Sequence, residues 1–374
     1  MTDEFYMNIA LELAKKGCGL VSPNPMVGAV IVKDGNIIGK GWHEQYGGLH
    51  AERNALARCS ESPQGATMYV NLEPCCHYGK TPPCTEAILE HGIKKVVIGS
   101  IDPNHIVAGK GIAVLKAHGV EVVTGVLEDK CKELNQVFFH YIQTKRPFVV
   151  MKYAMTMDGK IATVSGKSKW ITGEVARNQV HQERHRYSSI MVGVGTVIED
   201  NPMLNCRIDQ GRNPIRILCD TNLRTPLDSN IVMTAKNIRT IVATSCEDLE
   251  KQRPYLKASC ELIVVKKKGE HLDLVELMDE LGKRKIDSIL LEGGASLNAS
   301  ALEGQIVQRV QTYISPKLFG GKSAKTPIGG RGVQEVKDCY ELIHPKIHWF
   351  EEDLCIESEV KYPCLQESLK KLEP

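Results

Sequence analysis

At 374 residues the chain exceeds the usual size of one domain, and a length of roughly 150 residues per domain predicts two. Its 42% hydrophobic and 25% charged residues exclude a wholly disordered chain, and a formal charge of +2 lacks the basic surplus expected of a protein that wraps nucleic acid. No apolar run reaches the roughly 18 residues of a membrane span, and the acidic start is unlike a signal peptide. We therefore expect a cytoplasmic protein with no membrane partner and no nucleic-acid partner.

The first 145 residues alternate helix-like and strand-like segments. Residues 3–16 place apolar side chains at helical spacing, and Asp34-Gly35 between two apolar runs predicts a hairpin. The expected elements are a helix at 3–16, strands at 26–32 and 36–42, a helix at 50–59, a strand at 67–72, a helix at 83–91, a strand at 95–100, a helix at 110–118 and a strand at 120–125. This alternation predicts a layered α/β domain.

A second α/β series follows Lys145-Arg146-Pro147, where charge and proline predict a linker. We therefore expect domains at 1–145 and 146–374. In the second domain the expected strands are 189–195, 214–220, 239–244, 261–265 and 288–294, the expected helices are 173–187 and 272–284, and the tail from about 337 should form short strands and then a polar end.

The first domain holds a set of zinc-ligand residue types. His50 and Glu52 begin a helix, and Cys75 and Cys84 follow the next strand. One imidazole and two thiolates form a three-ligand zinc site that leaves a fourth position for water. Glu52 can lie over that open position and move protons. The order His-x-Glu, then Pro-Cys and a further Cys, is typical of zinc-dependent nucleobase deaminases.

The sequence leaves more than one choice for the cysteines that bind the metal. Eight residues separate Cys75 from Cys84 where the general deaminase pattern has two, so Cys76 competes with Cys75. Pro74 favours Cys75 because it fixes the turn after the strand, and the positive end of a helix favours a thiolate at Cys84. A fourth ligand from Cys76 or His77 would instead close the site, as in a structural zinc module attached to a nucleotide-sensing domain.

Two glycine-containing turns follow strands in the second domain, at 193–196 and 293–298. Each can direct backbone N–H groups toward a phosphate. A full G-x-G-x-x-G after a strand is missing, so a Rossmann-type dinucleotide site is not expected.

The motifs of the first domain resemble the deaminase half of the bifunctional riboflavin-biosynthesis deaminase–reductase family. The resemblance rests on SPNPMVGAVIV (22–32), GWHEQYGGLHAERNAL (41–56) and PCCHYGKTPPC (74–84). It implies a cytidine-deaminase-like α/β/α domain in which His50, Cys75 and Cys84 bind Zn²⁺ and Glu52 is catalytic. The residues that it implies for holding the pyrimidine or its phosphate are Asn24, His43, His77 and Lys80.

The second domain resembles the reductase half of the same family. The resemblance rests on MKYAMTMDGKIAT (151–163), SGKSKWITGEVAR (165–177), VGVGTVIEDNPMLNCR (192–207) and LLEGGASLNAS (290–300). It implies a dihydrofolate-reductase-like α/β fold that uses NADPH. The implied cofactor contacts are Ala154, Trp170, Thr196, Asp200, Thr221, Gly294, Ala295, Ser296, Leu297, Asn298, Ala299 and Ser300. The implied substrate contacts are Ser168, Arg184, Leu204, Arg207 and Glu292, and Lys152 is a further candidate on the strand beside them.

The resemblance implies two consecutive steps of riboflavin biosynthesis on one pyrimidine ribosyl phosphate. The first is hydrolytic deamination of 2,5-diamino-6-ribosylamino-4(3H)-pyrimidinone 5′-phosphate, and the second is NADPH-dependent reduction of the ribosyl to the ribityl side chain. It also implies a homo-oligomer, a dimer or tetramer. The alternative is a tRNA or nucleic-acid deaminase with an accessory domain. The near-neutral charge and the GKTPPC segment both argue against this alternative.

Overall fold

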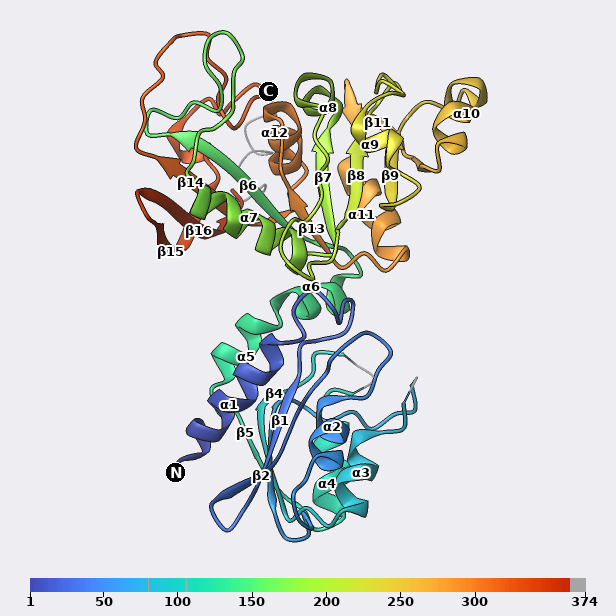
Figure 1. Ribbon diagram of the computed structural model, residues 1–374, viewed down its shortest axis with the longest axis vertical. Coiled ribbons are helices and arrows are strands. Elements are labelled where there is room, and N and C mark those ends of the chain that lie inside the picture. Colours follow the sequence, from blue (N-terminus) through green and yellow to red (C-terminus); the bar gives the residue numbers. More distant parts are fainter. Residues whose placement is uncertain (80, 105–106, 364–374) are drawn as a thin grey trace, which may run out of the picture. The chain divides into compact units, whose positions relative to one another are not determined.

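The computed structural model describes residues 1–79, 81–104 and 107–363. They fold into two compact units, one of residues Met1–Lys145 and a second from Arg146 onward (Figure 1). No helix in the described ranges is both long and apolar enough to cross a membrane.

The first unit is built on a five-stranded sheet. Its strands are β1 (Gly28–Lys33), β2 (Asn36–Trp42), β3 (Thr67–Leu72), β4 (Lys95–Ser100) and β5 (Glu121–Thr124), in the order β2-β1-β3-β4-β5. β1 pairs antiparallel with β2 and β3, whereas β3, β4 and β5 are parallel. Asp34 and Gly35 have φ of 48° and 80°, so the expected hairpin turn between β1 and β2 is confirmed.

Helices cover both faces of this sheet (Figure 1). They are α1 (Asp3–Lys15), α2 (Ala51–Ala57), α3 (Cys84–Glu90), α4 (Lys110–Ala117), α5 (Glu128–Leu134) and α6 (Gln136–Thr144). One core contains Met7 of α1 and Cys131 of α5, and the other contains Ala55, Ile88 and Leu115 of α2, α3 and α4. The α/β/α architecture is therefore confirmed. The parallel strands β3 and β4 end at the same edge, which gathers the loops that follow them.

The second unit is built on a nine-stranded sheet of order β10-β9-β8-β7-β13-β6-β14-β16-β15. Its strands are β6 (Phe148–Thr156), β7 (Ser189–Gly193), β8 (Ile215–Cys219), β9 (Thr240–Thr244), β10 (Glu261–Val264), β13 (Ser288–Leu291), β14 (Val307–Ser315), β15 (Glu341–Phe350) and β16 (Asp353–Lys361). The pairs are parallel except at β14–β16 and β15–β16.

Helices and one small hairpin complete the second unit. The helices are α7 (Glu174–Arg186), α8 (Val194–Asp200), α9 (Asn230–Met233), α10 (Leu249–Lys257), α11 (Leu274–Lys283), α12 (Ala295–Glu303) and the 3₁₀ helix η1 (Val336–Asp338), and the hairpin strands are β11 (Lys267–Lys268) and β12 (His271–Leu272). Two cores lie on the sheet, one around Leu277 and Leu281 of α11 and one around Ile231 and Tyr255.

Three strand expectations in the second unit were wrong in extent. The strand expected at 189–195 ends at Gly193, because α8 begins at Val194, and the strand expected at 288–294 ends at Leu291. Val194 continues the apolar run past β7, so the hydrophobic pattern alone could not locate that strand end, whereas Glu292, Gly293 and Gly294 already mark the end of the apolar run after β13. The expected short strands of the tail are instead the ten-residue β15 and the nine-residue β16.

Candidate active sites

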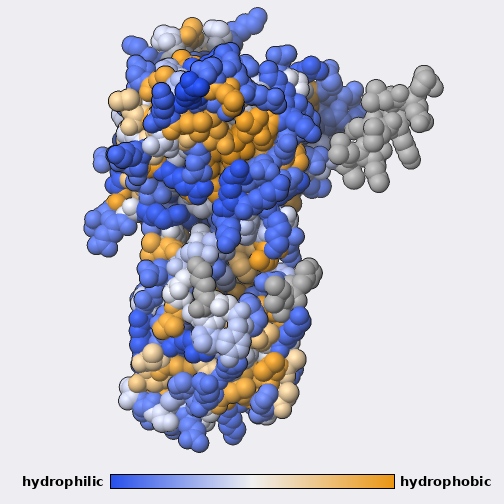
Figure 2. All heavy atoms as spheres, turned by 90° about the vertical axis from the view of Figure 1, so that its right-hand side faces the viewer, coloured by the Kyte–Doolittle hydropathy of each residue, from blue (hydrophilic) through white to orange (hydrophobic). Residues whose placement is uncertain are grey.

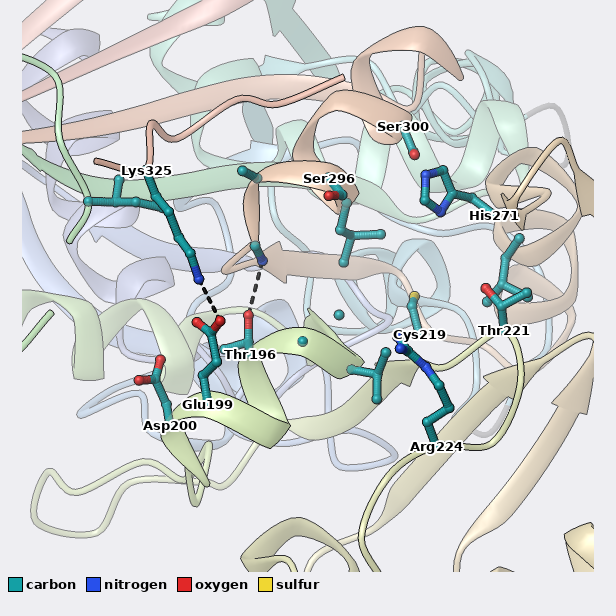
Figure 3. A pocket seen from close by; sticks show the side chains of 18 of the residues that line it. Thr196, Glu199, Asp200, Cys219, Thr221, Arg224, His271, Ser296, Ser300 and Lys325 are labelled. Carbon is teal, nitrogen blue, oxygen red and sulfur yellow. Dashed lines mark hydrogen bonds and ion pairs between the residues drawn. The ribbon is translucent and has the colours of Figure 1, made fainter. Parts of the chain in front are cut away.

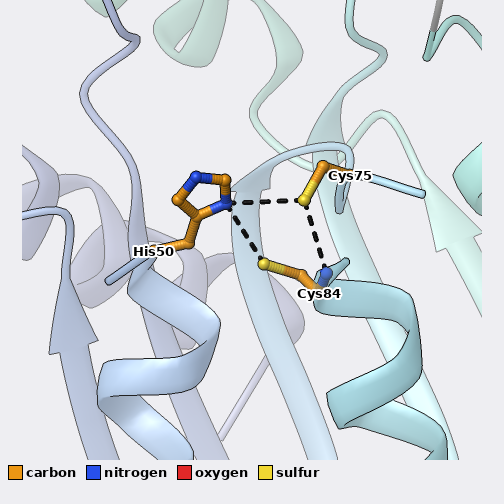
Figure 4. Close-up of side chains that lie close together, drawn as sticks. All are labelled: His50, Cys75 and Cys84. Carbon is orange, nitrogen blue, oxygen red and sulfur yellow. Dashed lines mark hydrogen bonds between the residues drawn. The ribbon is translucent and has the colours of Figure 1, made fainter. Parts of the chain in front are cut away.

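His50, Cys75 and Cys84 lie together at the edge of the first sheet (Figure 4). His50 precedes α2, Cys75 lies in the loop after β3, and Cys84 is the first residue of α3. The Nδ1 atom of His50 is 3.4 Å from the Cys75 sulfur and 3.3 Å from the Cys84 sulfur. The backbone N–H of Cys84 donates to the Cys75 sulfur at 3.3 Å. The helix start thus supports a thiolate.

This donor set fits zinc. The three ligand atoms lie within 4.8 Å of one another, and nitrogen with two sulfurs is a common zinc environment. The pKa of the Cys75 thiol is lowered to about 4 by its hydrogen bond with Cys84 and by the neighbouring His50. One thiolate is therefore present at neutral pH. Within the described ranges Cys76 and His77 are not part of this cluster. The geometry therefore favours three protein ligands and an open fourth position over a closed structural site.

Glu52 lies in the first turn of α2 and is only 3% exposed. Burial raises the pKa of its carboxyl, and the Cys75 sulfur raises it further. A carboxyl that takes up a proton readily suits proton transfer near neutral pH. Glu52 and His50 both line the same cavity of about 330 Å³.

Asn24, His43 and His77 line that cavity as well. The His43 Nδ1 atom lies 2.9 Å from the Leu49 carbonyl, which can only accept, so Nδ1 donates and Nε2 accepts from the Asn24 amide at 3.2 Å. The Nδ1 atom of His77 is buried and has no hydrogen-bond partner among the described residues. Lys80 lies outside the described residues.

The sequence analysis missed Asp102 and Asn104, which also line the cavity. Asp102 follows β4, and its carboxylate accepts from the Asn104 N–H at 2.8 Å. Burial raises the pKa of Asp102 to about 6. Both residues follow a parallel strand, and the carboxyl ends of parallel strands meet at one edge of a sheet. Their position in the sequence could therefore have indicated that they lie at the site.

A cavity of about 590 Å³ lies in the second unit (Figure 3). Its size suits a cofactor site, and the α12 N-terminus and the glycines of the 193–195 and 293–294 turns let backbone approach a ligand closely. Nine of the residues implied as reductase contacts line it: Ser168, Thr196, Asp200, Thr221, Gly294, Ala295, Ser296, Leu297 and Ser300. The donor groups and space therefore fit NADPH.

Four of the implied cofactor residues lie elsewhere. Asn298 and Ala299 are buried in α12, where the Asn298 amide donates to the Pro327 carbonyl at 2.9 Å. Trp170 is 60% exposed and has the Arg177 guanidinium 4.5 Å from its ring centroid. Ala154 lies on β6 and packs beside a small apolar cluster.

Two of the implied substrate residues, Arg184 and Glu292, form a buried ion pair. Arg184 of α7 donates two hydrogen bonds of 2.8 Å to the two carboxylate oxygens of Glu292, and a third of 3.1 Å to the Asn205 carbonyl. Burial would raise the pKa of Glu292, but Arg184 and Lys152 lower it to about 2. Glu292 is therefore ionised, bound by Arg184 and stabilised further by the charge of Lys152.

Arg207 and Leu204 lie in the loop that Arg184 contacts. Arg207 donates to the Asn205 side chain at 3.3 Å, and Leu204 is buried with φ of 49°. Lys152 of β6 has its ammonium 5.5 Å from the ring centroid of Tyr313, and burial lowers its pKa. Since Arg184 and Glu292 bind each other, their side chains are fixed before a substrate arrives.

Comparison with known proteins finds relatives for both units. Residues 147–356 match the RibD C-terminal domain, and residues 1–100 match the cytidine and deoxycytidylate deaminase zinc-binding region. The chain is 56% identical to the riboflavin biosynthesis protein RibD of Actinobacillus pleuropneumoniae, over 97% of this chain and 96% of that protein. It is 37% identical to RibD of Escherichia coli, over 95% of this chain and 99% of that protein.

Solved structures show the same likeness. The diaminohydroxyphosphoribosylaminopyrimidine deaminase/5-amino-6-(5-phosphoribosylamino)uracil reductase of Thermotoga maritima superposes with a TM-score of 0.86 at 40% identity, covering 97% of this chain and 99% of that one. RibD of Acinetobacter baumannii gives a TM-score of 0.85 at 34% identity, covering 96% and 99%. The chain belongs to the RibD family of bifunctional riboflavin-biosynthesis enzymes, in which a zinc-dependent deaminase unit precedes an NADPH-dependent reductase unit.

Proposed function

We propose that residues 1–145 deaminate 2,5-diamino-6-ribosylamino-4(3H)-pyrimidinone 5′-phosphate and that residues 146–374 then reduce its ribosyl group. The observation that carries this proposal is the cluster of His50, Cys75 and Cys84 with buried Glu52 in one cavity. Its three protein ligands and neighbouring carboxyl match the requirements of hydrolytic deamination.

In the first unit, His50, Cys75 and Cys84 hold the metal, which when bound makes water acidic enough to attack at neutral pH. Glu52 accepts a proton from the attacking water and delivers it to the departing amino group, so that ammonia leaves and a carbonyl replaces the amine at C2. Asn24 and His43 hold the pyrimidine, because their mutual hydrogen bond fixes the amide beside the cavity. His77 and Lys80 contact the substrate's polar groups.

In the second unit, the cavity lined by Thr196, Asp200 and Thr221 positions NADPH, which when bound supplies the hydride that arrives at C1′ of the ribosyl group. The C1′–O4′ bond breaks, and O4′ takes the electron pair and a proton. Lys152 is half-buried and feels the charges of Glu292 and Arg184, so it can direct its ammonium at O4′ and stabilise the charge that develops there.

The remaining residues implied by the resemblance have different proposed roles, which follow from where each one lies. Glu292, fixed by Arg184, accepts from sugar hydroxyls, while Arg207 of the neighbouring loop pairs with the substrate phosphate. Ser168 lines the cofactor cavity, and Leu204 is buried in the loop that also carries Arg207. Trp170 and Ala154 stay proposed cofactor contacts from the family resemblance, although neither lines this cavity.

We also propose that the enzyme is a cytoplasmic homo-oligomer that assembles through its reductase units. β15 is the last strand of the nine-stranded sheet, and it exposes 60% of Ile347 and 69% of Trp349. A separate apolar area on the second unit is visible in the upper half of Figure 2. Exposed apolar side chains of this extent commonly mark protein interfaces. A reducing compartment keeps the Cys75 and Cys84 thiols available to metal.

The test is the mass of the product formed from the diaminopyrimidine ribosyl phosphate. Deamination adds about one mass unit without NADPH, and reduction adds about two more when NADPH is present, because NH is exchanged for O and two hydrogens are then gained. Glu52→Gln should retain stoichiometric zinc and lose at least about 10²-fold in deamination rate. Zinc retained together with full activity would refute the role of Glu52.

A further inference from the structure

The cofactor cavity of the second unit has ends of opposite character (Figure 3). One end carries Glu199, Asp200 and Lys325, and the ammonium of Lys325 is 2.5 Å from the Glu199 carboxylate. The other end is formed by the loop after β8, where Thr221 and Arg224 lie on the same side of the cavity as His271. We call this second end the β8-loop end; Asn222 and Glu270 complete its lining.

Arg224 is the cation available to a ligand at this end. Its side chain lines the cavity and is exposed, and among the described residues no hydrogen bond or ion pair engages its guanidinium. Lys325, by contrast, is already paired with Glu199. An unpaired guanidinium with a free fork of N–H donors at a cavity wall suits a phosphate.

The loop that carries Arg224 is fixed by buried hydrogen bonds. The carboxylate of Asp220, which is fully buried, accepts from the backbone N–H of Thr225 at 2.7 Å and from its hydroxyl at 2.6 Å. The Tyr255 hydroxyl donates to the Thr225 carbonyl at 2.6 Å. The backbone on both sides of Arg224 is therefore held before a ligand binds, which reduces the entropy lost on binding.

The surrounding charges favour a dianion at the β8-loop end. The ammonium of Lys267 donates to the Asn222 side chain at 3.2 Å, which holds this cation beside the loop. The hairpin of β11 and β12 brings His271 to the cavity as well. Glu270 opposes these groups with one negative charge. At the far end, Asp200 and Glu199 present two carboxylates against the single cation Lys325, which disfavours a phosphate there.

We propose that Arg224, assisted by Lys267, binds the 2′-phosphate of NADPH and makes the reductase prefer NADPH to NADH. This inference rests on the proposed placement of the cofactor in this cavity. Thr221, three residues before Arg224, then contacts the adenosine side of the cofactor, and the α12 N-terminus meets the pyrophosphate. NADH lacks the 2′-phosphate and would leave the Arg224 guanidinium without its anionic partner.

Binding of adenosine 2′,5′-bisphosphate and adenosine 5′-monophosphate, each titrated into the zinc-loaded full chain by calorimetry, tests the inference without turnover. Arg224→Gln should weaken the bisphosphate about tenfold or more and leave the monophosphate within about twofold, because only the bisphosphate carries the 2′ group. Arg253→Gln is the matched control, since Arg253 is an exposed arginine of α10 paired with Glu250. It should change neither affinity.

The same variants are then assayed with NADPH and NADH. Arg224→Gln should raise the KM for NADPH about tenfold or more and leave the KM for NADH unchanged. Equal losses with both nucleotides, or unchanged affinity for the bisphosphate, would overturn the assignment of Arg224. A wild-type chain that binds the bisphosphate tightly through Arg224 but transfers no hydride to the substrate would refute the proposed reduction and leave this inference standing.

Discussion

The ion pair of Arg184 and Glu292 shows how one residue's charge depends on its surroundings. Each side chain is only 13% exposed, and the two share parallel hydrogen bonds. A buried pair of this kind contributes little net stability as a pair, but loss of one member leaves a charge buried without compensation. Lys152 makes the effect larger, because Glu292 also offsets its charge.

We therefore expect Glu292→Gln to lower the unfolding free energy of the second unit by about 3 kcal/mol. Glu261→Gln provides the comparison, because Glu261 forms the same fork with Arg239 while 47% of its side chain is exposed, and should cost less than about 1 kcal/mol. Denaturant unfolding of both variants measures the difference. Equal losses would mean that burial does not govern this pair.

His181 links the same site to pH. It is 7% exposed on α7, and burial, together with Arg184 and Arg207, lowers its pKa to about 4. An unfolded histidine has a pKa of about 6.5. Between these values the unfolded chain binds more protons than the folded chain, so stability present above pH 6.5 is lost as the pH falls toward 4.

We expect the unfolding free energy of the second unit to fall below pH 6.5 with a contribution from His181 of at most about 1.4 kcal/mol per pH unit. His181→Gln should flatten this slope in denaturant unfolding at several pH values. His118→Gln should not, since His118 is exposed and lies directly after α4 in the first unit. A slope that survives His181→Gln unchanged would assign the acid sensitivity to other groups.

At the scale of elements, the sequence predicted the first unit better than the second. The alternation of apolar runs and turns predicted β1 to β5, because each strand is short and charged residues or glycines lie near its ends. β14 was missed because Arg309 and Gln311 interrupt its apolar pattern, and both bind Glu357 of β16 across the sheet. Glu357 lies nearly 50 residues away from both in the sequence. The burial of Arg309 and Gln311 could therefore not be predicted from the neighbouring residues.

The site residues of the first unit could also be predicted better than those of the second. His50, Cys75 and Cys84 could be proposed from their spacing, because helix starts and strand ends fix where such ligands lie. The binding of Arg184 to Glu292 could not, because 108 residues separate them. The availability of the Arg224 guanidinium depends equally on three-dimensional neighbours, since no described residue forms an ion pair or hydrogen bond with it although Glu270 lines the same end of the cavity.

Packing of α2 on β2 supports the metal ligands, and it leaves no room at Gly41. A Cβ atom added there would lie 2.3 Å from the Ala55 nitrogen and 2.5 Å from the Ala51 carbonyl oxygen. Since both contacts are backbone atoms of α2, the helix must move. We expect Gly41→Ala to destabilise the first unit by about 1–3 kcal/mol and to reduce its zinc content at limiting metal.

Gly195→Ala is the control for that change, because its Cβ atom would meet nothing within 4 Å and it lies in the other unit. Metal analysis by mass spectrometry after dialysis against limiting zinc separates the two. Full zinc occupancy and native stability in Gly41→Ala would show that α2 adjusts without disturbing His50 and Glu52.

At the level of the whole molecule, the chain folds into two compact units, each with its own hydrophobic core. The groups proposed for deamination all belong to residues 1–145, and those proposed for reduction all come from beyond Arg146. We therefore expect a substitution in one proposed site to leave the chemistry of the other unchanged. The deaminated intermediate is the one species that both sites must handle.

Mixing two singly inactivated proteins tests this independence. Glu52→Gln should reduce but not deaminate, and Lys152→Gln should deaminate but reduce at least about 10²-fold more slowly. With NADPH present, an equimolar mixture should form the doubly shifted product, because the intermediate released by Lys152→Gln can enter the reductase site of Glu52→Gln. Product mass after timed quenching follows both steps. A mixture that accumulates only the deaminated species, while the Glu52→Gln protein reduces added intermediate, would mean that the intermediate is retained by the enzyme that made it.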